Sequence, residues 1–420
     1  MILKVLAGLG LVLVVLAAAQ MLLLLFGLIS RLVDEAKRRK LERQILAEQF
    51  EAARCRRLKE EESVLPWHGN RKFRIDRKEP ECKDVASFYL TAHDGKPLPE
   101  YLPGQYLTFE LDTPGRQKRL IRCYSLSDRP RPDRYRVTIK LIRAPADSPD
   151  AMHGIGSTFF HQHLKAGDIV DVRAPSGGFC LDQSRPFPVV FIAGGIGVTP
   201  LLSMLYEIVE TGSKRETWCF FGARNGGEHA FKKQIEKIAR ENENVRLHVC
   251  YSQPRAEDQA GQDFQHAGRL SVDLLRKILP SNNYDFFLCC PGEMMQEMDA
   301  GLRKWGVPAK SIHTEAFGAA TVKRTARADE KGKSAVGLAV HFAKSNRKTL
   351  WTAQVESLLE LAATTEVAID SGCRAGNCGT CRVAIKSGEV KYLREPGCLV
   401  EAGTCLTCCC VPVTELVLDA

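Results

Sequence analysis

The sequence has almost no charge at its start, where Lys4 is the only charged side chain in the first thirty residues. From Val5 to Ser30 the only strongly polar residue is Gln20. About 20 apolar residues are enough for a helix to cross a bilayer, so this run can span one. A cleaved signal peptide is the alternative, because the stretch AAAQ resembles a cleavage site, but the apolar run continues well beyond it. We therefore expect a transmembrane anchor over residues 1–30.

The following segment has neither proline nor glycine from Arg31 to Glu62 and is rich in Glu, Lys, Arg, Leu and Ala. This composition predicts a charged helical linker over residues 31–65. Its cations contribute much of the net charge of +9, and their position beside the apolar run favours a membrane flank over a nucleic-acid-binding surface. The positive-inside rule then predicts a single-pass protein whose catalytic domains lie in the cytoplasm.

The sequence also lacks a Ser–His–Asp set and any metal-hydrolase motif, which leaves no basis for a hydrolase of these kinds. It has 16 cysteines, half of them in the last fifty residues. This crowding in a long chain does not resemble a disulfide framework. It favours metal-bound thiolates in a reducing compartment.

With 420 residues, the chain is long enough for two to four domains. Short alternating segments such as YLTFEL and RYRVTIKLI predict an antiparallel β-barrel over residues 66–182. Buried strands that alternate with helices predict an α/β, doubly wound parallel-sheet domain over residues 183–320. A polar linker over 321–334 leads to a further β-rich unit over 335–420.

One turn in the predicted parallel-sheet domain is rich in glycine. The stretch GGIGVTP contains Gly194, Gly195, Gly197, Thr199 and Pro200 between an apolar strand and a helix. Glycines at such a turn let backbone amides approach a phosphate at the helix N-terminus. Many similar turns are glycine-rich only for packing, so this motif alone leaves nucleotide binding and packing both open.

A second motif resolves that ambiguity. The stretch RCYSLSDRP, with Arg122, Tyr124, Ser125 and Ser127, resembles the flavin motif of the ferredoxin–NADP reductase superfamily. The resemblance implies that Tyr124 packs against the isoalloxazine, that Arg122 pairs with the flavin phosphates and that Ser125 bonds the flavin ring. These residue types suit those tasks, because an aromatic ring can stack and a guanidinium can bind phosphate.

Further stretches resemble the reductase module of flavohaemoglobins, in the same order and over about residues 70 to 320. Gly154 and Ser157 match a G-x-x-S position that implies a capped helix facing the flavin pyrophosphate. HTEAFG, with Glu315 and Phe317, resembles the end of the module, where relatives place an aromatic over the other flavin face. The glycine turn matches the nicotinamide-nucleotide loop. The likeness implies FAD in preference to FMN, and excludes haem because no globin precedes the module.

Three further residues need separate treatment. Cys289 takes the place of the family cysteine that faces the nicotinamide, whereas Cys290 stands where relatives have glycine. Tyr124, Ser125 and Cys289 are therefore the catalytic candidates. Arg224 follows a predicted strand and could bind a 2′-phosphate or merely end the strand, which leaves the choice between NADH and NADPH open.

The C-terminal unit contains Cys373, Cys378 and Cys381 in C-x4-C-x2-C spacing. This spacing matches that of plant-type ferredoxins, which bind a [2Fe–2S] cluster, and it implies an α+β, β-grasp ferredoxin-like domain. The stretch LTCCCVP resembles the family's context for the fourth ligand and favours Cys408, with Cys405 as the alternative. Zinc is the rival metal, but structural zinc sites usually use two short cysteine pairs.

Taken together, these parts resemble oxygenase reductases with a C-terminal cluster. The resemblance implies that NADH or NADPH donates a hydride to FAD, and that single electrons pass through the cluster to a separate acceptor protein. Tethering to a membrane suggests a membrane-bound acceptor, such as a fatty-acid desaturase or a hydroxylase. The alternatives are a redox sensor and a quinone-reductase subunit, although the sodium-pumping NADH–quinone reductase has its ferredoxin domain before its flavin domain. No nucleic-acid partner is expected.

Overall fold

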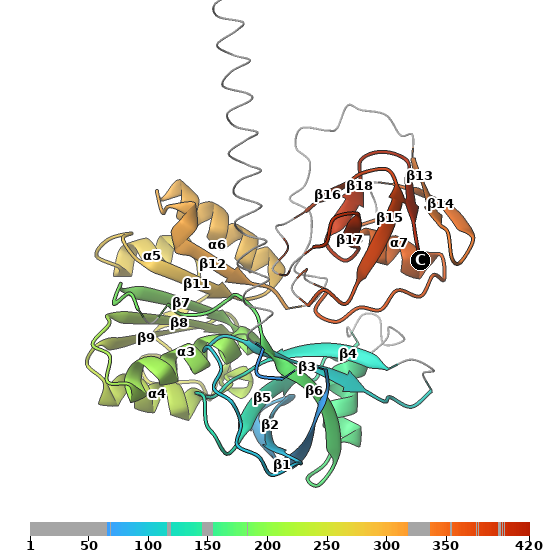
Figure 1. Cartoon of the computed structure of the whole chain (residues 1–420). Coiled ribbons are helices and arrows are strands. Elements are labelled where there is room, and N and C mark those ends of the chain that lie inside the picture. The colour runs from blue at the N-terminus through green and yellow to red at the C-terminus, as the bar shows by residue number, and fades with distance from the viewer. Residues whose placement is uncertain are drawn as a thin grey trace, which may run out of the picture. The chain divides into compact units, whose positions relative to one another are not determined.

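Figure 1 shows the computed structural model of the chain. The structure describes residues 65–67, 69–115, 119–144, 154–182, 184–317, 337–352, 355–374, 376, 378–393, 396, 398 and 400–420. The predicted anchor, nearly all of the charged segment that follows it and the linker over 321–334 lie outside these residues. Within the described residues, no helix has both the length and the apolar character to cross a membrane.

The first sheet has six strands in the order β4-β3-β6-β1-β2-β5, and each neighbouring pair is antiparallel. The strands are β1 (Arg71–Cys82), β2 (Val85–Ala92), β3 (Tyr106–Leu111), β4 (Leu120–Ser125), β5 (Tyr135–Lys140) and β6 (Ile169–Ser176). A bridge between Leu126 and Val137 joins the two outer strands. The sheet therefore closes into the expected barrel, whose interior holds aromatic and aliphatic side chains such as Phe73, Phe88 and Phe109.

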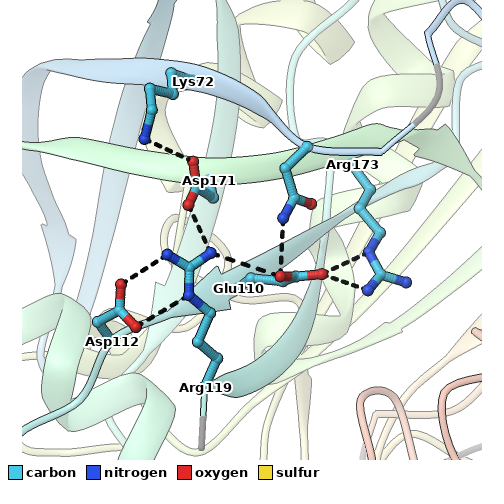
Figure 2. Close-up of polar contacts among 7 residues, drawn as sticks. Lys72, Glu110, Asp112, Arg119, Asp171 and Arg173 are labelled. Atoms are coloured by element: carbon cyan, nitrogen blue, oxygen red, sulfur yellow. Dashed lines mark hydrogen bonds and ion pairs between the residues drawn. The ribbon is translucent and has the colours of Figure 1, made fainter.

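Charged side chains form a network on the outside of this barrel, over β1, β3 and β6 (Figure 2). Arg119 bonds Asp171 at 2.8 Å and Asp112 at 3.0 Å. Lys72 also bonds Asp171, at 3.1 Å, and Arg173 bonds Glu110 at 2.9 Å. Arg119 and Lys72 are well exposed, with side-chain accessibilities of 44% and 62%, so these are surface interactions.

The second sheet is parallel throughout, in the order β10-β9-β8-β7-β11-β12. Its strands are β7 (Val189–Gly194), β8 (Thr217–Ala223), β9 (Val245–Tyr251), β10 (His266–Ala267), β11 (Asp285–Cys289) and β12 (Ile312–Glu315). The main helices are α3 (Val198–Glu210), α4 (Lys232–Glu241), α5 (Val272–Ile278) and α6 (Gly292–Lys304). Helices α3 and α4 lie on one face of the sheet and α5 and α6 on the other (Figure 1).

The apolar run of β7 has a simple explanation. Val189 and Phe191 pack into the core beneath α3 and α4, whereas Val190 and Ile192 pack into the core beneath α5 and α6. Both faces of the strand are buried, so both sets of alternate residues must be apolar. The chain proceeds outward from β7 in one direction through β8 and β9, then returns to place β11 on its other side. The carboxyl ends of β7 and β11 thus form the switch point at which doubly wound sheets bind ligands.

The C-terminal domain contains a five-stranded mixed sheet, β14-β13-β19-β15-β17, and a two-stranded sheet, β16-β18. The strands are β13 (Leu338–Phe342), β14 (Arg347–Trp351), β15 (Arg382–Ser387), β16 (Val390–Tyr392), β17 (Thr404–Leu406), β18 (Cys410–Pro412) and β19 (Leu416–Leu418). Strands β13 and β14 pair as an antiparallel hairpin. Helix α7 (Leu358–Thr364) begins at Ser357, whose hydroxyl accepts the Glu360 N–H at 3.2 Å. The cysteine-rich loop lies between α7 and β15.

Candidate functional site

The predicted flavin motif lies on β4. Tyr124 packs edge-on against Phe109 and Phe160, at centroid separations of 5.8 and 5.1 Å. Burial raises the pKa of the Tyr124 phenol, so this ring stays neutral at physiological pH. The next residue, Ser125, is buried and donates its hydroxyl proton to Glu315 at 3.2 Å. This bond connects the barrel to the end of β12, and it brings together two predicted site residues separated by most of the module.

A short helical turn approaches the same motif. Helix α2 (Ile155–Thr158) contains Gly156, where an added Cβ would lie 2.8 Å from Arg122 Cγ and 3.0 Å from the Tyr124 hydroxyl. Glycine is therefore needed here for a close approach of backbone to the motif. Arg122, Tyr124 and the backbone at Gly156 form a polar and aromatic cradle, a composition that suits a flavin with its phosphates.

The expected role of Ser157 as a helix cap is wrong. Helix α2 begins at Gly154 without a side-chain hydrogen bond to its first turn. The Ser157 hydroxyl instead accepts the Ile142 N–H at 3.0 Å and donates to the Gly154 carbonyl at 2.8 Å. Ser157 therefore ties α2 to the chain that leaves β5, which positions this turn beside the motif.

Ser127 also differs from its expected role. Its side chain is fully buried, and its hydroxyl contacts Thr138 at 2.8 Å and the Arg136 guanidinium at 3.1 Å. A buried hydroxyl with these partners has no surface left for a cofactor. We assign Ser127 a structural role on the face of β5 opposite the barrel core, where its partner Arg136 lies over the rings of Tyr206 and Phe231 of the nucleotide domain.

The other expected flavin residues lie at the end of the parallel-sheet domain. Glu315 is buried, with 5% exposure, whereas the Phe317 ring is 39% exposed. An apolar ring this exposed is available to cover a planar ligand. The position of Glu315 against Ser125 brings this segment to the flavin motif.

The glycines of the nucleotide turn have two different functions. A Cβ at Gly194 would lie 2.7 Å from the Cβ of Cys290, and one at Gly197 would lie 1.9 Å from the Cys289 carbonyl oxygen. These two glycines allow close packing between the ends of β7 and β11. Gly195 has a left-handed φ of 54°, and a Cβ there would meet no atom within 4 Å.

The backbone at Gly195 is therefore open, as a phosphate-binding turn requires, and the turn leads into α3 through the 3-10 turn η2 (Gly195–Gly197). Thr199 and Pro200 are buried in the first turn of α3. The Thr199 hydroxyl donates to the Ile196 carbonyl at 3.1 Å, which braces the turn. Gly194 and Gly197 thus serve packing, whereas the open backbone at Gly195 is compatible with the predicted binding of a nucleotide.

Cys289 ends β11 with 1% exposure, and Cys290 follows with 5%. Burial raises the pKa of both thiols, to about 12 for Cys290. Both thiols are therefore protonated at physiological pH, and neither has the thiolate character of a nucleophile. The contribution of Cys289 to the site comes through its carbonyl and its packing against Gly197.

Arg224 follows β8 and points its charge to solvent, with a side-chain accessibility of 68% and Glu228 at 3.5 Å. Sequence reasoning missed three residues beside this strand end, namely Asn225, Ser252 and Arg255. The Ser252 N–H donates to the Ala223 carbonyl at 3.0 Å, which joins the ends of β8 and β9. Arg255 donates to the Asn225 side chain at 2.7 Å. The sequence shows a parallel between the two strand ends, because YSQPR covers the end of β9 as FGARN covers the end of β8.

The four predicted cluster cysteines form two pairs. The Cys373 N–H donates to the Cys378 sulfur at 3.2 Å, and the Cys378 N–H donates to the Cys373 sulfur at 3.3 Å. Cys381 and Cys408 form the second pair through their side chains. A [2Fe–2S] cluster has two irons and four thiolate ligands, two for each iron, so this arrangement fits its donor set.

The cysteine contacts also bear on the fourth ligand. Among the described residues, no three His, Cys, Asp or Glu side chains gather as they would around a single ion. Cys405, the alternative to Cys408, pairs with Cys410 of β18, whereas Cys408 pairs with Cys381. These contacts favour Cys408 as the fourth ligand.

The cysteine-rich loop contacts the flavin motif. A Cβ at Gly372 would lie 3.1 Å from the Ile121 side chain, and the Arg122 guanidinium is 3.5 Å from the Ser371 carbonyl oxygen. Hydrogen bonding, first from Cys123 and then from Cys373, lowers the pKa of Cys378 below its ordinary value. The loop thus lies against the strand that carries Arg122 and Tyr124.

Comparison with known proteins agrees with the division into a barrel domain, a parallel-sheet domain and a C-terminal domain. The chain matches an oxidoreductase FAD-binding domain over residues 72–180, an oxidoreductase NAD-binding domain over 191–300 and a 2Fe-2S iron-sulfur cluster binding domain over 343–413. A flavohemoprotein of Halalkalibacterium halodurans is 38% identical over 267 residues, which cover 63% of this chain and 64% of that protein. The chain therefore spans less than two thirds of this curated relative.

Two solved structures are similar to the described part. The flavohem-like FAD/NAD-binding domain of nitric oxide dioxygenase from Vibrio cholerae is 31% identical, is covered over its whole length and matches 60% of this chain with a TM-score of 0.53. Phthalate dioxygenase reductase, described as a modular structure for electron transfer from pyridine nucleotides to [2Fe-2S], is 25% identical and matches 84% of this chain and 98% of its own with a TM-score of 0.52. With its FAD, NAD and [2Fe–2S] domains in this order, the chain belongs to the ferredoxin reductase-type NAD(P)H oxidoreductases.

Proposed function

We propose that this protein is a membrane-anchored reductase that takes electrons from NADH or NADPH and delivers them to a separate acceptor protein. The observation that supports it most is the contact of the loop that contains Cys373 and Cys378 with strand β4 of the FAD domain. Electron transfer between two cofactors needs them to lie close together, and this contact brings the residues that would hold them side by side.

Different residues would bind different parts of the flavin and of the dinucleotide. When bound, the flavin supplies the exchange between a two-electron nicotinamide donor and a one-electron [2Fe–2S] carrier. Arg122 and the backbone at Gly156 would hold the flavin phosphates, and Tyr124 and Phe317 would cover its ring. The Ser125 hydroxyl, whose proton is donated to Glu315, would place a hydrogen-bond acceptor at the ring edge. The open backbone at Gly195 would receive the dinucleotide phosphates.

The reductase activity is tested by anaerobic mixing of the purified protein with NADH and with NADPH. We expect the flavin absorbance to bleach, a paramagnetic signal of the reduced cluster to appear, and cytochrome c to be reduced rapidly as an artificial acceptor. The rates of flavin reduction with NADH and with NADPH identify the preferred electron donor. Slow reduction without turnover on cytochrome c would reject a reductase and support the redox-sensor alternative.

The anchor is supported by the sequence alone. The apolar run from Val5 to Ser30 and the basic segment after it favour a single span with the catalytic domains in the cytoplasm. We expect the full chain to remain with membranes after a carbonate wash, and a variant without residues 1–30 to become extractable while it retains cytochrome c reduction. Equal extraction of both would contradict the anchor.

The acceptor is tested by pull-down from solubilised membranes with the full chain. A non-haem iron oxygenase, hydroxylase or desaturase that accepts electrons from the reductase would support the proposal. Capture of a quinone-reducing complex that needs this chain for turnover would favour the quinone-reductase alternative.

A further inference from the structure

Arg136 is a buried cation where the barrel meets the parallel-sheet nucleotide domain. It lies on β5 and has 5% exposure. The Cζ atom of its guanidinium lies 5.0 Å from the ring centroid of Phe231 and 5.7 Å from that of Tyr206, and both rings belong to the nucleotide domain. A third ring, that of Tyr89 on β2 of the barrel, lies at 6.0 Å. The cation thus occupies an aromatic cage to which both domains contribute.

The polar contacts of this cation come from the barrel. Arg136 Nε donates to the Ser127 hydroxyl at 3.1 Å, and Nη2 donates to the Ser127 carbonyl oxygen. The Ser127 N–H in turn donates to the Arg136 carbonyl at 2.9 Å. A guanidinium taken out of water needs such bonds, because burial without them is costly. These bonds attach the cage to the segment that leaves the flavin motif, since Ser127 follows Ser125 by two residues.

The backbone at Phe231 is strained where this residue meets Arg136. Phe231 directly precedes α4, has a left-handed φ of 58° and is 1% exposed. A bulky residue rarely adopts this conformation, which persists only where the surrounding structure holds it. The contact with Arg136 is part of those surroundings, so the barrel contributes to the position of this ring in the nucleotide domain.

Tyr206 belongs to one face of α3 that lies against the barrel. Ser203, Tyr206 and Glu210 are three and four residues apart, so they lie on the same side of the helix. The buried Ser203 hydroxyl donates to the Asp128 carbonyl oxygen at 2.6 Å. Glu210 forms an ion pair with Arg131 at 3.6 Å. This face of α3 is therefore attached to the barrel segment that follows the flavin motif.

We propose that Arg136 is a positioning residue that fixes α3, and with it the glycine turn, relative to the flavin motif, and thereby sets the approach of the nicotinamide to the flavin. This inference rests on the proposed function. Helix α3 leads directly from the turn that contains Gly195, and Arg136 bonds the segment that follows Ser125. Hydride transfer depends steeply on the distance and alignment of the reacting groups, so a small shift of one domain lowers its rate strongly.

The test uses Arg136→Met in the full chain with FAD and the cluster bound. Methionine removes the charge and the forked donor but keeps an unbranched side chain that can fill the cage. Anaerobic stopped-flow mixing with the preferred dinucleotide measures flavin reduction. We expect the limiting rate to fall by about tenfold or more, while the dissociation constant of the dinucleotide changes by about twofold or less. Arg136→Lys, which keeps the charge without the fork, should give an intermediate rate.

A second measurement needs no dinucleotide. Hydrogen exchange of the α3 amides reports how firmly this helix is held, and in Arg136→Met it should be about threefold to tenfold faster. Faster exchange with an unchanged limiting rate would overturn the proposal, because Arg136 would then only stabilise the helix. An unchanged exchange rate would overturn it as well.

Arg77→Met is the matched control. Arg77 of β1 also lies over Tyr89, at 3.5 Å from the ring centroid, and bonds Glu79 at 2.7 Å, and these partners belong to the barrel. Its limiting rate and its α3 exchange should equal those of the wild type. Equal losses in Arg77→Met and Arg136→Met would overturn the proposal.

If Arg136→Met does not fold with both cofactors, Tyr206→Leu replaces it, because it removes one wall of the cage from the other domain and leaves the bonds of Arg136 to Ser127 in place. The same thresholds then apply to Tyr206→Leu. A wild-type protein whose flavin is reduced by neither NADH nor NADPH would instead refute the proposed function, so the two failures can be told apart.

Discussion

Neighbouring cysteines occur in two regions of this molecule, and their surroundings differ. At the end of β11, Cys289 and Cys290 are buried, and their pKa values are raised chiefly by that burial. In the cluster loop, hydrogen bonds from Cys123 and Cys373 lower the pKa of Cys378, whereas the hydrogen bond with Cys408 raises the pKa of Cys381. The same side chain is therefore a packing group in one region and a prospective metal ligand in the other.

The comparison shows that neighbouring cysteines can serve close packing in one region and mutual pairing in the other. The β11 region uses its cysteines to fit closely against glycines, as Gly197 beneath the Cys289 carbonyl shows. The cluster loop uses left-handed Gly379 and Arg374, with φ values of 69° and 51°, to turn the backbone so that its sulfurs face one another. Substitutions in the cluster loop should therefore affect the cluster, whereas substitutions in the β11 region should affect stability.

The largest effect is expected from Cys408→Ser. Loss of one of four ligands should abolish the paramagnetic signal of the cluster and reduce cytochrome c reduction to the level that the flavin alone supports. Bleaching of the flavin by NADH or NADPH should persist, because the nucleotide and flavin residues lie in other domains. Iron content, cluster signal and flavin bleaching are measured on the same preparation.

Cys410→Ser is the control for this variant. Cys410 is as buried as its neighbours but contacts Cys405 on β17 and not the ligand pair. It should retain the iron and the signal. If Cys410→Ser lost the cluster and Cys408→Ser kept it, the assignment of the fourth ligand would be wrong.

Much of this architecture could be predicted from the sequence, because it depends on local patterns. The alternation of β3, β5 and β6, the apolar run of β7 and the hairpin of β13 and β14 follow from which faces are buried. The cluster spacing predicted the ligand loop for the same reason, since three ligands lie within nine residues of one another in the chain. These features need no knowledge of how domains meet.

The features that were missed depend on contacts between distant segments. The role of Ser127 could not be predicted, because the motif resembles a cofactor site while the hydroxyl contacts Arg136 of another strand. The contact of Arg122 with Ser371 joins residues 249 positions apart on different domains. No pattern in one sequence encodes such a contact, because it is determined by how two folded surfaces fit.

In the β11 region, the next largest effect is expected from Gly197→Ala. The new Cβ would lie 1.9 Å from the Cys289 carbonyl oxygen, so backbone must move. We expect a loss of about 2–3 kcal/mol in the free energy of unfolding of the nucleotide domain, typical of overpacking. Urea unfolding followed by intrinsic fluorescence measures it.

Gly195→Ala is the matched control for the steric effect. Its Cβ meets no atom, but the left-handed φ of 54° should cost about 1 kcal/mol. Because Gly195 is where the phosphates would approach, this variant should raise the KM for the dinucleotide more than its stability loss explains. Equal stability losses in the two variants would show that close packing against β11 is not what Gly197 provides.

A smaller effect is expected from Cys290→Gly. The substitution removes a buried side chain that packs on Gly194 and adds backbone freedom to the unfolded chain, so the free energy of unfolding should fall by about 1 kcal/mol. The KM for the dinucleotide should change by a few-fold, and the cluster signal should not change. Cys290→Ala separates the loss of the thiol from the added flexibility. A loss of flavin reduction by tenfold or more in both variants would make Cys290 a site residue rather than a packing residue.

The smallest effect is expected outside both cysteine regions, in the charge network of the barrel (Figure 2). Burial opposes the charged form of Asp171, but hydrogen bonds from Lys72 and Arg119 outweigh it, so its pKa lies below the ordinary value. The stabilisation is therefore present above the unfolded pKa of about 3.9 and is lost as the pH falls through the lower folded pKa. Because both cations are exposed, Asp171→Asn should cost about 1 kcal/mol or less at pH 7, measured by urea unfolding. The difference from the wild type should begin to shrink below about pH 4 and disappear once the pH is below the lowered folded pKa of Asp171. It should also shrink in high salt, since exposed pairs are screened. A loss at pH 7 as large as that of Gly197→Ala would mean that these exposed ion pairs support the barrel as strongly as close packing supports the nucleotide turn.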